Sequence, residues 1–381
     1  MRISKISKVA ILATAAVVAL VPSAVAYDLT GQGSSAVANF IEKCKVDYQN
    51  DTKDTFSYLG TGSGDGIAKI NDGTKDIGYS DNVNTTPAAG VFHIPAAVWP
   101  IAIAYNLNNS ASKSVQLSIP TIAKIFSGKI TRWNDPAIVA DVQRVRSIPV
   151  YKLSNGKPVL DANGSPIVAS YRSLSIPMTM PDKPITVIYR ASTSGTTNNF
   201  TSALAGAAPT IWTKAGNSSF ATSNPTDISA LAGTFQGASG SAGVAALAGS
   251  TKYSITYVEP SYVASTPSLK AAVVINNAGK TTSPDASGAT AMFAASDFND
   301  TTGIVTWKYA TTAAAAYPFT AATYAMAKTN YGKADLAAAV KRQIEYVAFN
   351  CSAKVTTEPM ILITKTSDLG KAILKLTAKI A

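Results

Sequence analysis

The chain has 381 residues, 46% of them hydrophobic and 14% charged, and its formal net charge is +11. This composition excludes an intrinsically disordered protein, and the length is sufficient for two globular domains. The basic excess suits either an anionic ligand or weak binding to acidic polymers. We expect no nucleic-acid partner because no arginine-rich run with interleaved aromatic residues occurs. One histidine and two cysteines argue against a metal centre built from these residue types, and we expect no cofactor.

The first 26 residues are predicted to be a signal peptide. Basic residues stand at positions 2, 5 and 8, and the apolar run Val9–Val21 that follows is too short to span a bilayer. Ala24-Val25-Ala26 has the small-residue pattern of a signal-peptidase site, and no cysteine stands there to carry a lipid anchor. We therefore expect cleavage after Ala26 and a periplasmic or secreted protein.

Two loops rich in glycine and serine lie near the start of the mature chain, each before a helical pattern. The first precedes apolar residues at helical spacing from Val37 onward, and Ser34 or Ser35 is a natural N-cap. The second, residues 60–66, follows a strand pattern at residues 56–59. It lacks the Lys-Ser/Thr ending of a nucleotide P-loop, so we expect a small-anion site at these helix starts rather than a nucleotide site.

Asp81 directly follows a short predicted strand at residues 76–80. An Asp in this position is commonly a turn residue or a helix cap. The alternative is a contact with the ligand. A buried carboxylate beside an anion is favourable only if the anion carries a proton to donate, as HPO₄²⁻ and H₂PO₄⁻ do and SO₄²⁻ does not. Asp81 is therefore a candidate residue for distinguishing phosphate from sulfate.

His93, the only histidine, lies in an apolar stretch. A catalytic role would require a recognisable nucleophile, and none is evident, so we interpret His93 as a structural residue. Residues 150–168 contain two Asn-Gly pairs and predict an inserted hairpin or loop. Arg132 is placed on a surface turn. Further helices are predicted at residues 118–128, 237–249, 334–349 and 367–380. A strand is predicted at residues 253–258, and Glu259 directly follows it.

The segment Thr186–Leu204 combines a strand, a turn and a helix start. The β-branched and aromatic run at its beginning predicts a buried strand with Arg190 at its carboxyl end. A small-residue turn follows, and the helix is expected to begin near Thr196. Unpaired N–H groups at a helix N-terminus and a planar guanidinium together favour an oxyanion. The alternative is an ordinary strand-to-helix turn in which Arg190 pairs with a surface acid.

Several of these motifs, in this order, resemble one family. YRASTSGTTNNFT is similar to the Arg-x-x-x-Ser-Gly-Thr-x-x-x-Phe-Thr signature of the extracytoplasmic phosphate-binding proteins of ABC-type phosphate uptake, including the DING-type proteins. GTGSGDGIAKI, DIGYSD, IFSGKITRWNDPAI, GSAGVAAL and YSITYVEPSY resemble further segments of that family. The resemblance extends over most of the mature chain.

The resemblance implies an α/β fold, the type II periplasmic binding protein. In this fold two α/β domains are joined by two crossover hinge segments, and the ligand lies in the cleft between the domains. The implied first domain is discontinuous and comprises residues 27–104 and 259–381, and the second comprises residues 105–258. Because Cys44 and Cys351 both fall in the first domain of an exported protein, we expect them to form a disulfide.

The resemblance also implies a set of phosphate-binding residues: Ser35, Ala36, Ser63, Asp81, Arg190, Ser194, Gly195 and Thr196. Asp81 would accept the proton of the phosphate. Two positions depart from the family pattern. Ala36 replaces an aromatic residue and offers only its backbone N–H, and Ser192 replaces an Asp that usually pairs with the arginine, which would leave Arg190 less neutralised.

The function implied by the resemblance is capture of inorganic phosphate and its delivery to a membrane ABC permease by a monomeric protein that is not an enzyme. Two alternative functions are compatible with the same scaffold. A secreted phosphatase on the same scaffold would need a nucleophile with a base or a metal-activated water, and the sequence offers no evident base. A surface adhesin that retained the fold is the third interpretation.

Overall fold

The computed structural model describes residues 26–381, except residues 109–113, 156, 162–165, 177 and 232. The predicted signal peptide, apart from Ala26, lies outside the described residues. Within the part that the structure describes, no helix has both the length and the apolar character needed to cross a membrane.

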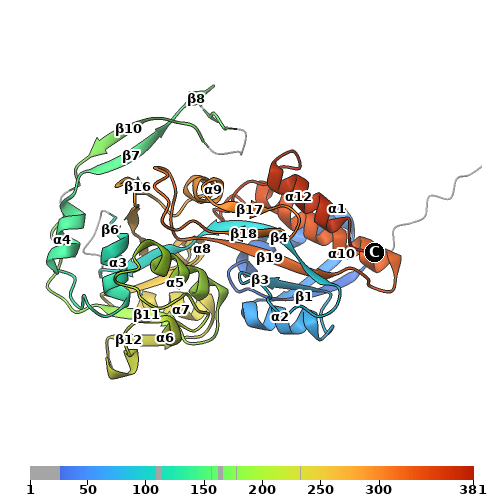
Figure 1. The fold of residues 1–381 in the computed structure, drawn as a ribbon, viewed down its shortest axis with the longest axis horizontal. Helices are drawn as coiled ribbons and strands as arrows, with labels where there is room; N and C mark the ends of the chain where they lie inside the picture. The colour runs from blue at the N-terminus through green and yellow to red at the C-terminus, as the bar shows by residue number, and fades with distance from the viewer. Residues whose placement is uncertain (1–25, 109–113, 156, 162–165, 177, 232) are drawn as a thin grey trace, which may run out of the picture.

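The first domain is built on a five-stranded mixed sheet with the order β2-β1-β3-β19-β4 (Figure 1). β1 pairs in parallel with β2 and β3, and β19 is antiparallel to both of its neighbours. The strands are β1 (Asp28–Gly33), β2 (Thr55–Leu59), β3 (Ile77–Ser80), β4 (Val91–Pro100) and β19 (Thr320–Lys328). The main helices of this domain are α1 (Ala38–Thr52), α2 (Ser63–Asn71), α9 (Ala286–Ala294), α10 (Ala334–Glu345) and α12 (Asp368–Thr377).

The second domain contains another five-stranded sheet, with the order β12-β11-β13-β5-β14. β11 is parallel to β12 and β13, whereas β5 is antiparallel to β13 and β14. The strands are β5 (Ala102–Asn106), β11 (Thr186–Arg190), β12 (Phe235–Ala238), β13 (Ser254–Val258) and β14 (Lys270–Ala271). The principal helices here are α3 (Ile119–Phe126), α4 (Pro136–Gln143), α5 (Gly195–Ala207) and α7 (Gly240–Ser250).

The chain passes between the two sheets twice. β4 ends at Pro100 in the first sheet and β5 begins at Ala102 in the second, and the chain returns to the first sheet with β19. β14 belongs to the second sheet although it follows residue 259, and β5 begins before residue 105. The predicted domain limits stay a prediction. These two strands indicate that the second domain begins before residue 105 and continues past residue 258.

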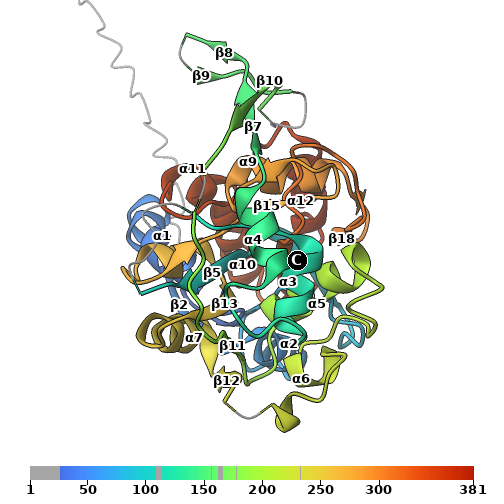
Figure 2. The ribbon, with the colours of Figure 1, turned by 90° about the vertical axis from the view of Figure 1, so that its left-hand side faces the viewer.

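An arm projects from the second domain (Figures 1 and 2). It consists of the antiparallel pair β7 and β10 and, beyond it, the short pair β8 and β9. The segment expected to be an inserted hairpin or loop therefore forms the outer part of a longer hairpin. Its strands are β7 (Arg146–Tyr151), β8 (Leu153–Ser154), β9 (Lys157–Pro158) and β10 (Val168–Leu174).

The remaining elements are short. The strands are β6 (Gln116–Ser118), β15 (Val273–Ile275), β16 (Thr281–Thr282), β17 (Asp297–Asn299) and β18 (Ile304–Thr306), and the helices are α6 (Phe220–Ser223), α8 (Pro260–Ala264) and α11 (Ser352–Lys354), with a 3₁₀ turn at Ile228–Ala230 and a π-helical segment at Tyr346–Cys351. One buried core connects both domains and includes stacked aromatic rings such as Phe200 and Tyr257, whose centroids are 4.2 Å apart. This core holds the second sheet and the start of α5 in place.

Candidate functional site

The two domains meet where strands end and helices begin. β1 leads to α1, β2 to α2 and β11 to α5, and Asp81 follows β3. Gly195, at the start of α5, is packed so closely against the first domain that a Cβ atom there would lie 2.4 Å from the Ser63 hydroxyl and 2.6 Å from the Asp81 Cβ. Carboxyl ends of parallel strands are the common ligand-binding edge of α/β sheets. The structure thus brings the start of α5 and the ends of β2 and β3 to one place.

Asp81 is a buried acceptor with three hydroxyl partners. Its Oδ2 accepts hydrogen bonds from Ser34 at 2.8 Å and Ser63 at 3.2 Å, and its Oδ1 accepts one from Thr323 at 2.6 Å. The residue is only 5% exposed. Burial raises the pKa of Asp81 to about 6, an effect that the hydroxyl hydrogen bonds oppose and the charge of Glu259 reinforces. The carboxylate can therefore change its protonation state close to neutral pH.

Arg190 extends from the end of β11 toward the first domain and is 2% exposed. The partners of its guanidinium are serine hydroxyls: Nη1 lies 3.1 Å from Ser35 Oγ and 3.4 Å from Ser241 Oγ, and Nη2 lies 3.3 Å from Ser192 Oγ. Its Nε is buried without a hydrogen-bond partner. Among the described residues no carboxylate oxygen forms an ion pair with this guanidinium. Arg190 is thus a buried cation with neutral partners and suits an anionic ligand.

The start of α5 holds Ser194, Gly195 and Thr196. Ser194 is the N-cap, and its hydroxyl accepts from the Thr197 N–H at 3.3 Å. The Thr196 hydroxyl donates to Glu259 Oε1 at 2.8 Å. The first N–H groups of a helix lie outside its own hydrogen-bond ladder, so this turn presents donors at the positive end of the helix dipole.

The first loop differs from its expected arrangement. Neither Ser34 nor Ser35 caps α1, because the N-cap is Val37 and no side chain caps it. Ser34 Oγ instead accepts from the Ala36 N–H at 3.1 Å while it donates to Asp81. Ser35 Oγ lies 3.0 Å from Ser241 Oγ and contacts Arg190 across the domain interface. The serines of this loop therefore order the site and leave the helix end uncapped.

The site includes residues that sequence reasoning did not assign to it. Glu259, Ser241 and Thr323 each contact one of the expected site residues. Asn199 joins the domains, since its side-chain amide donates to the backbone oxygen of Asp81 at 2.8 Å. One sequence feature pointed to Glu259, because this residue, like Asp81, directly follows a predicted buried strand.

The His93 side chain has a structural role. Its Nε2 accepts a hydrogen bond from the Asn84 N–H at 2.8 Å, and its ring packs edge to face against Tyr324. Burial lowers the pKa of His93, which favours the neutral imidazole that this bond requires.

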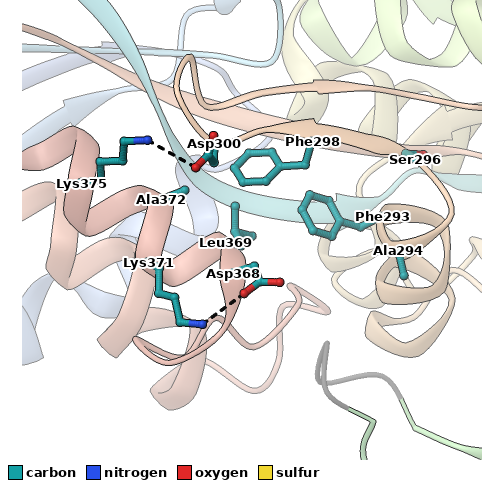
Figure 3. A pocket seen from close by; sticks show the side chains of 10 residues that line it. All are labelled: Phe293, Ala294, Ser296, Phe298, Asp300, Asp368, Leu369, Lys371, Ala372 and Lys375. Atoms are coloured by element: carbon teal, nitrogen blue, oxygen red, sulfur yellow. Dashed lines mark hydrogen bonds and ion pairs between the residues drawn. The ribbon is translucent and has the colours of Figure 1, made fainter.

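Figure 3 shows a cavity of about 470 Å³ between α9, the β17 region and α12. It shares no residue with the site described above. Its charged side chains form ion pairs with one another, Lys371 with Asp368 and Lys375 with Asp300. Because these lysines are already paired with carboxylates and are exposed to solvent, this cavity is a less favourable binding site for an anion than the interdomain site.

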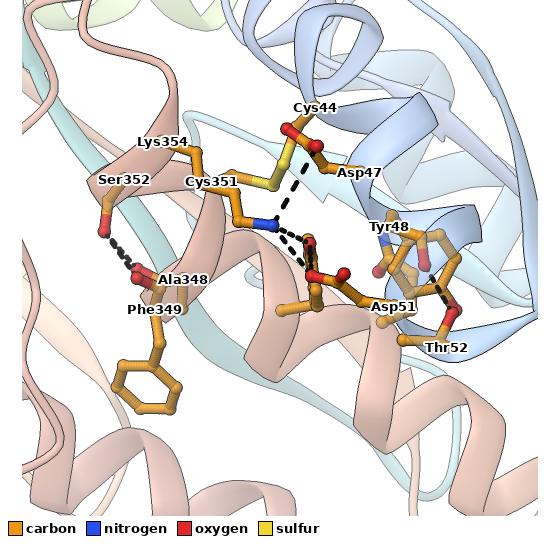
Figure 4. The surroundings of a disulfide bond; sticks show 12 residues. Cys44, Asp47, Tyr48, Asp51, Thr52, Ala348, Phe349, Cys351, Ser352 and Lys354 are labelled. Atoms are coloured by element: carbon orange, nitrogen blue, oxygen red, sulfur yellow. Dashed lines mark hydrogen bonds and ion pairs between the residues drawn. A yellow bond between two sulfur atoms is a disulfide. The ribbon is translucent and has the colours of Figure 1, made fainter.

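A disulfide connects Cys44 in α1 to Cys351 at the end of the π-helical segment (Figure 4). The Cα atoms are 5.6 Å apart, and the two residues are 307 positions apart in the sequence. Lys354 forms an ion pair with Asp51 beside the bond at 2.7 Å. The disulfide ties the C-terminal part of the first domain to its first helix.

Comparisons with known proteins agree with this architecture. A family model described as a PBP superfamily domain matches residues 20–348. Phosphate-binding protein PstS 3 of Mycobacterium tuberculosis is 32% identical over 261 residues, which cover 66% of this chain and 58% of the relative, so the match spans less than two thirds of that protein. PstS 3 of Mycobacterium leprae is 29% identical over 335 residues, covering 82% of this chain and 76% of the relative.

Solved structures share the fold at low sequence identity. The ancestral soluble variant of the human phosphate binding protein matches with a TM-score of 0.65 at 20% identity, covering 92% of this chain and 93% of that one. A putative phosphate ABC transporter substrate-binding protein from Clostridium perfringens, solved with bound phosphate, matches with a TM-score of 0.54 at 17% identity, covering 88% and 100%. These structures share the expected fold of two α/β domains, and the family model that matches residues 20–348 shows that the chain belongs to the PBP superfamily.

Proposed function

We propose that this protein captures inorganic phosphate outside the cytoplasm and delivers it to a membrane ABC permease. The observation that carries the proposal is the buried Asp81 carboxylate beside the start of α5. A Cβ atom added to Gly195 at that helix start would lie 2.8 Å from Asp81 Oδ2. An anion held by Arg190 and this helix start would contact the carboxylate, and only an anion with an O–H group can donate to it. The names of the PstS relatives support the same ligand.

The proposed binding set is Ser35, Ala36, Ser63, Asp81, Arg190, Ser194, Gly195 and Thr196. Arg190 and the N–H groups of the α5 start would hold phosphate oxygens, and Asp81 would accept the P–OH proton. Ala36 has the least support in this set, because its N–H already donates to Ser34 Oγ.

Phosphate entry requires the domains to separate. Asp81 and Arg190 are buried, and the contacts of Arg190 with Ser35 and of Asn199 with Asp81 join the two domains over the site. We propose that the domains open and close about the two segments where the chain crosses between the sheets. The closed arrangement would exclude water and strengthen the interactions with the anion.

We propose binding without catalysis. The hydroxyl groups of Ser63 and Thr196 donate to the Asp81 and Glu259 carboxylates, which in this proposal serve as hydrogen-bond acceptors and not as the base that activates a nucleophile. We propose that the protein acts as a monomer in the periplasm or outside the cell, and the predicted signal peptide supports this location.

Calorimetry on the mature protein, unfolded and refolded to remove bound ligand, tests the proposal with phosphate, sulfate and a phosphomonoester. We expect saturable phosphate binding, and a stabilisation of about 2.7 kcal/mol when phosphate is ~100-fold above Kd. Sulfate should bind more weakly by a factor of about 10⁴. Binding of neither anion would refute the proposal, and release of phosphate from the monoester would favour the phosphatase alternative.

Asp81→Asn provides the specificity test. The Asn side chain both donates and accepts, so the variant should bind sulfate better than the wild type and keep much of its phosphate affinity. An unchanged phosphate-to-sulfate preference in competition experiments at fixed pH and ionic strength would show that Asp81 does not contact the ligand.

A further inference from the structure

The buried carboxylate of Asp54 lies at the opposite end of β1 from the proposed phosphate site. Asp54 stands in the turn between α1 and β2 and is 0% exposed. Its backbone N–H donates to the Thr52 hydroxyl at 3.2 Å, and Lys53 before it has the left-handed backbone conformation that ends α1. Burying a carboxylate is costly unless cations or hydrogen-bond donors surround it, so the partners of Asp54 decide what it can do.

The two oxygens of the Asp54 carboxylate have different kinds of partner. Oδ2 accepts hydrogen bonds from Arg342 Nε at 2.9 Å and Nη2 at 2.7 Å, and from the Tyr48 hydroxyl at 3.3 Å. Oδ1 accepts a hydrogen bond from the backbone N–H of Tyr27 at 3.0 Å. A carboxylate forms a stronger hydrogen bond with a cationic donor than with an amide. Oδ1 would therefore gain if the nitrogen of Tyr27 carried a positive charge.

Tyr27 is held in place by its backbone and by its side chain. Its N–H donates to Asp54, its carbonyl oxygen accepts from the Thr55 N–H at 2.8 Å, and its ring packs against the core. Ala26, directly before it, is exposed. Chain ends are poorly ordered unless contacts of this kind tie them down. The contacts with the fold thus begin at Tyr27, the residue that the predicted signal-peptidase cleavage would make the first of the mature chain.

We propose that Asp54 is the binding site for the α-ammonium group that cleavage after Ala26 creates at Tyr27, so that processing adds an ion pair to the folded protein. A protease hydrolyses the Ala26–Tyr27 peptide bond with one water molecule. The oxygen of this water makes Ala26 a carboxylate, and its two protons convert the Tyr27 N–H into an ammonium. The existing N–H···O hydrogen bond then becomes a charge-assisted one. Departure of the exposed Ala26 opens the nitrogen to water, which solvates the other two N–H groups.

The charged and titratable groups around this nitrogen come from β1, α1, α10 and the turn before β2. They are Asp28 beside Tyr27, Tyr48, Arg342 and Asp54. Burial and the charge of Asp54 raise the pKa of Tyr48, so this hydroxyl stays neutral. The buried carboxylate in direct contact outweighs the more distant and partly exposed guanidinium, so the ammonium form is favoured.

This balance gives the stabilisation a defined pH dependence. The ordinary pKa of an α-amino group is about 7.7–8.0, and the contact with Asp54 should raise it in the folded protein. The folded state then holds the proton more tightly than the unfolded state does. The stabilisation is therefore fully present below about pH 7.7 and is lost as the pH rises through the higher pKa of the folded protein.

Two chains that differ by one residue test the proposal: the mature protein that begins at Tyr27 and the same protein that begins at Ala26. In the longer chain the Tyr27 nitrogen is an amide, and the ammonium lies one residue further out. Thermal unfolding at about pH 7 should give the Tyr27 chain a midpoint higher by about 2 °C or more, and this difference should close toward about pH 10.5. Equal midpoints at about pH 7, or a difference that is constant with pH, would overturn the proposal.

Asp54→Asn assigns the effect to this carboxylate. The Asn side chain carries no charge, so the difference between the two chains should disappear. The matched control is Asp51→Asn, because the Asp51 carboxylate in α1 also accepts from a cation, Lys354 at 2.7 Å, but is 47% exposed and makes no contact with Tyr27. The control should keep the wild-type difference, and a difference that persists in Asp54→Asn would overturn the assignment.

A measurement on the unsubstituted chains decides the case in which Asp54→Asn does not fold. The rate of N-terminal acetylation, followed by mass spectrometry at several pH values, gives the pKa of the α-amino group. This pKa should exceed about 9 in the chain that begins at Tyr27 and stay at about 7.7–8.0 in the chain that begins at Ala26. Equal values in the two chains would overturn the proposal.

N-terminal sequencing of the protein exported from the full chain tests the cleavage itself. Tyr27 is the expected first residue, and any other first residue would overturn the assignment. Both chains should bind phosphate with the same affinity in calorimetry, because Tyr27 precedes β1 and the proposed site begins after it. The proposal is thus independent of phosphate capture, and its failure would leave that function standing.

Discussion

Asp81→Asn should change how the stability of the ligand-free protein depends on pH. Burial raises the pKa of Asp81 in the folded protein to about 6 from an ordinary value of 3.8. A raised carboxyl pKa means that the folded state binds its proton more tightly than the unfolded state. The stabilisation is thus fully present below the unfolded pKa and is lost as the pH rises through about 6.

The size of the effect follows from the separation of the two pKa values. About two pH units correspond to about 3 kcal/mol, and at 5% exposure the group needs little allowance for solvent screening. Asn does not titrate and lacks this loss. The free energy of unfolding of the variant minus that of the wild type should therefore rise by about 3 kcal/mol between about pH 3.5 and about pH 7.5.

Urea unfolding of the phosphate-free mature proteins at several pH values measures this difference. Rearranged hydrogen bonds to the surrounding hydroxyls add a term that is constant with pH, so the change with pH isolates the titration. Asp182→Asn is the control, since its carboxylate is 66% exposed and pairs with Arg132 at the surface, where such pairs contribute about 0–1 kcal/mol. A difference for Asp81→Asn that stays constant with pH would refute the reasoning.

Three further results are expected. Arg190→Ala should lower phosphate affinity by about 100-fold or more in calorimetry, whereas Arg132→Ala should leave it unchanged, and equal effects would mean that the site is misplaced. Gly195→Ala should weaken binding, because its Cβ would lie 2.4 Å from a serine hydroxyl of the other domain and hold the domains apart, and unchanged affinity would contradict this closed arrangement. Replacing Cys44 and Cys351 with serine should lower the free energy of unfolding by about 2–5 kcal/mol and leave phosphate affinity unchanged, while two free thiols in the unfolded, unreduced wild type would exclude the bond.

Local sequence determined the parts of the site that depend on neighbouring residues. The strand before Arg190, the turn after it and the start of α5 at Gly195 all follow from residues within one short segment. Ser194 caps this helix and Ser118 caps α3, since a cap needs only a hydroxyl at the first turn and the N–H groups next to it. Asp81 could likewise be placed at a strand end from the sequence, because the strand pattern lies in the residues directly before it.

The tertiary structure decided which distant residues complete the site and in which direction their hydroxyls donate. Thr323 reaches Asp81 because β19 pairs with β3 from a position 242 residues further along the chain, and no local pattern specifies that pairing. Glu259 and Thr196 meet only through the packing of α5 against the second sheet. A hydroxyl donates or accepts according to the partner that the fold provides, so a list of site residues read from the sequence could not specify which of them accept a proton from the ligand.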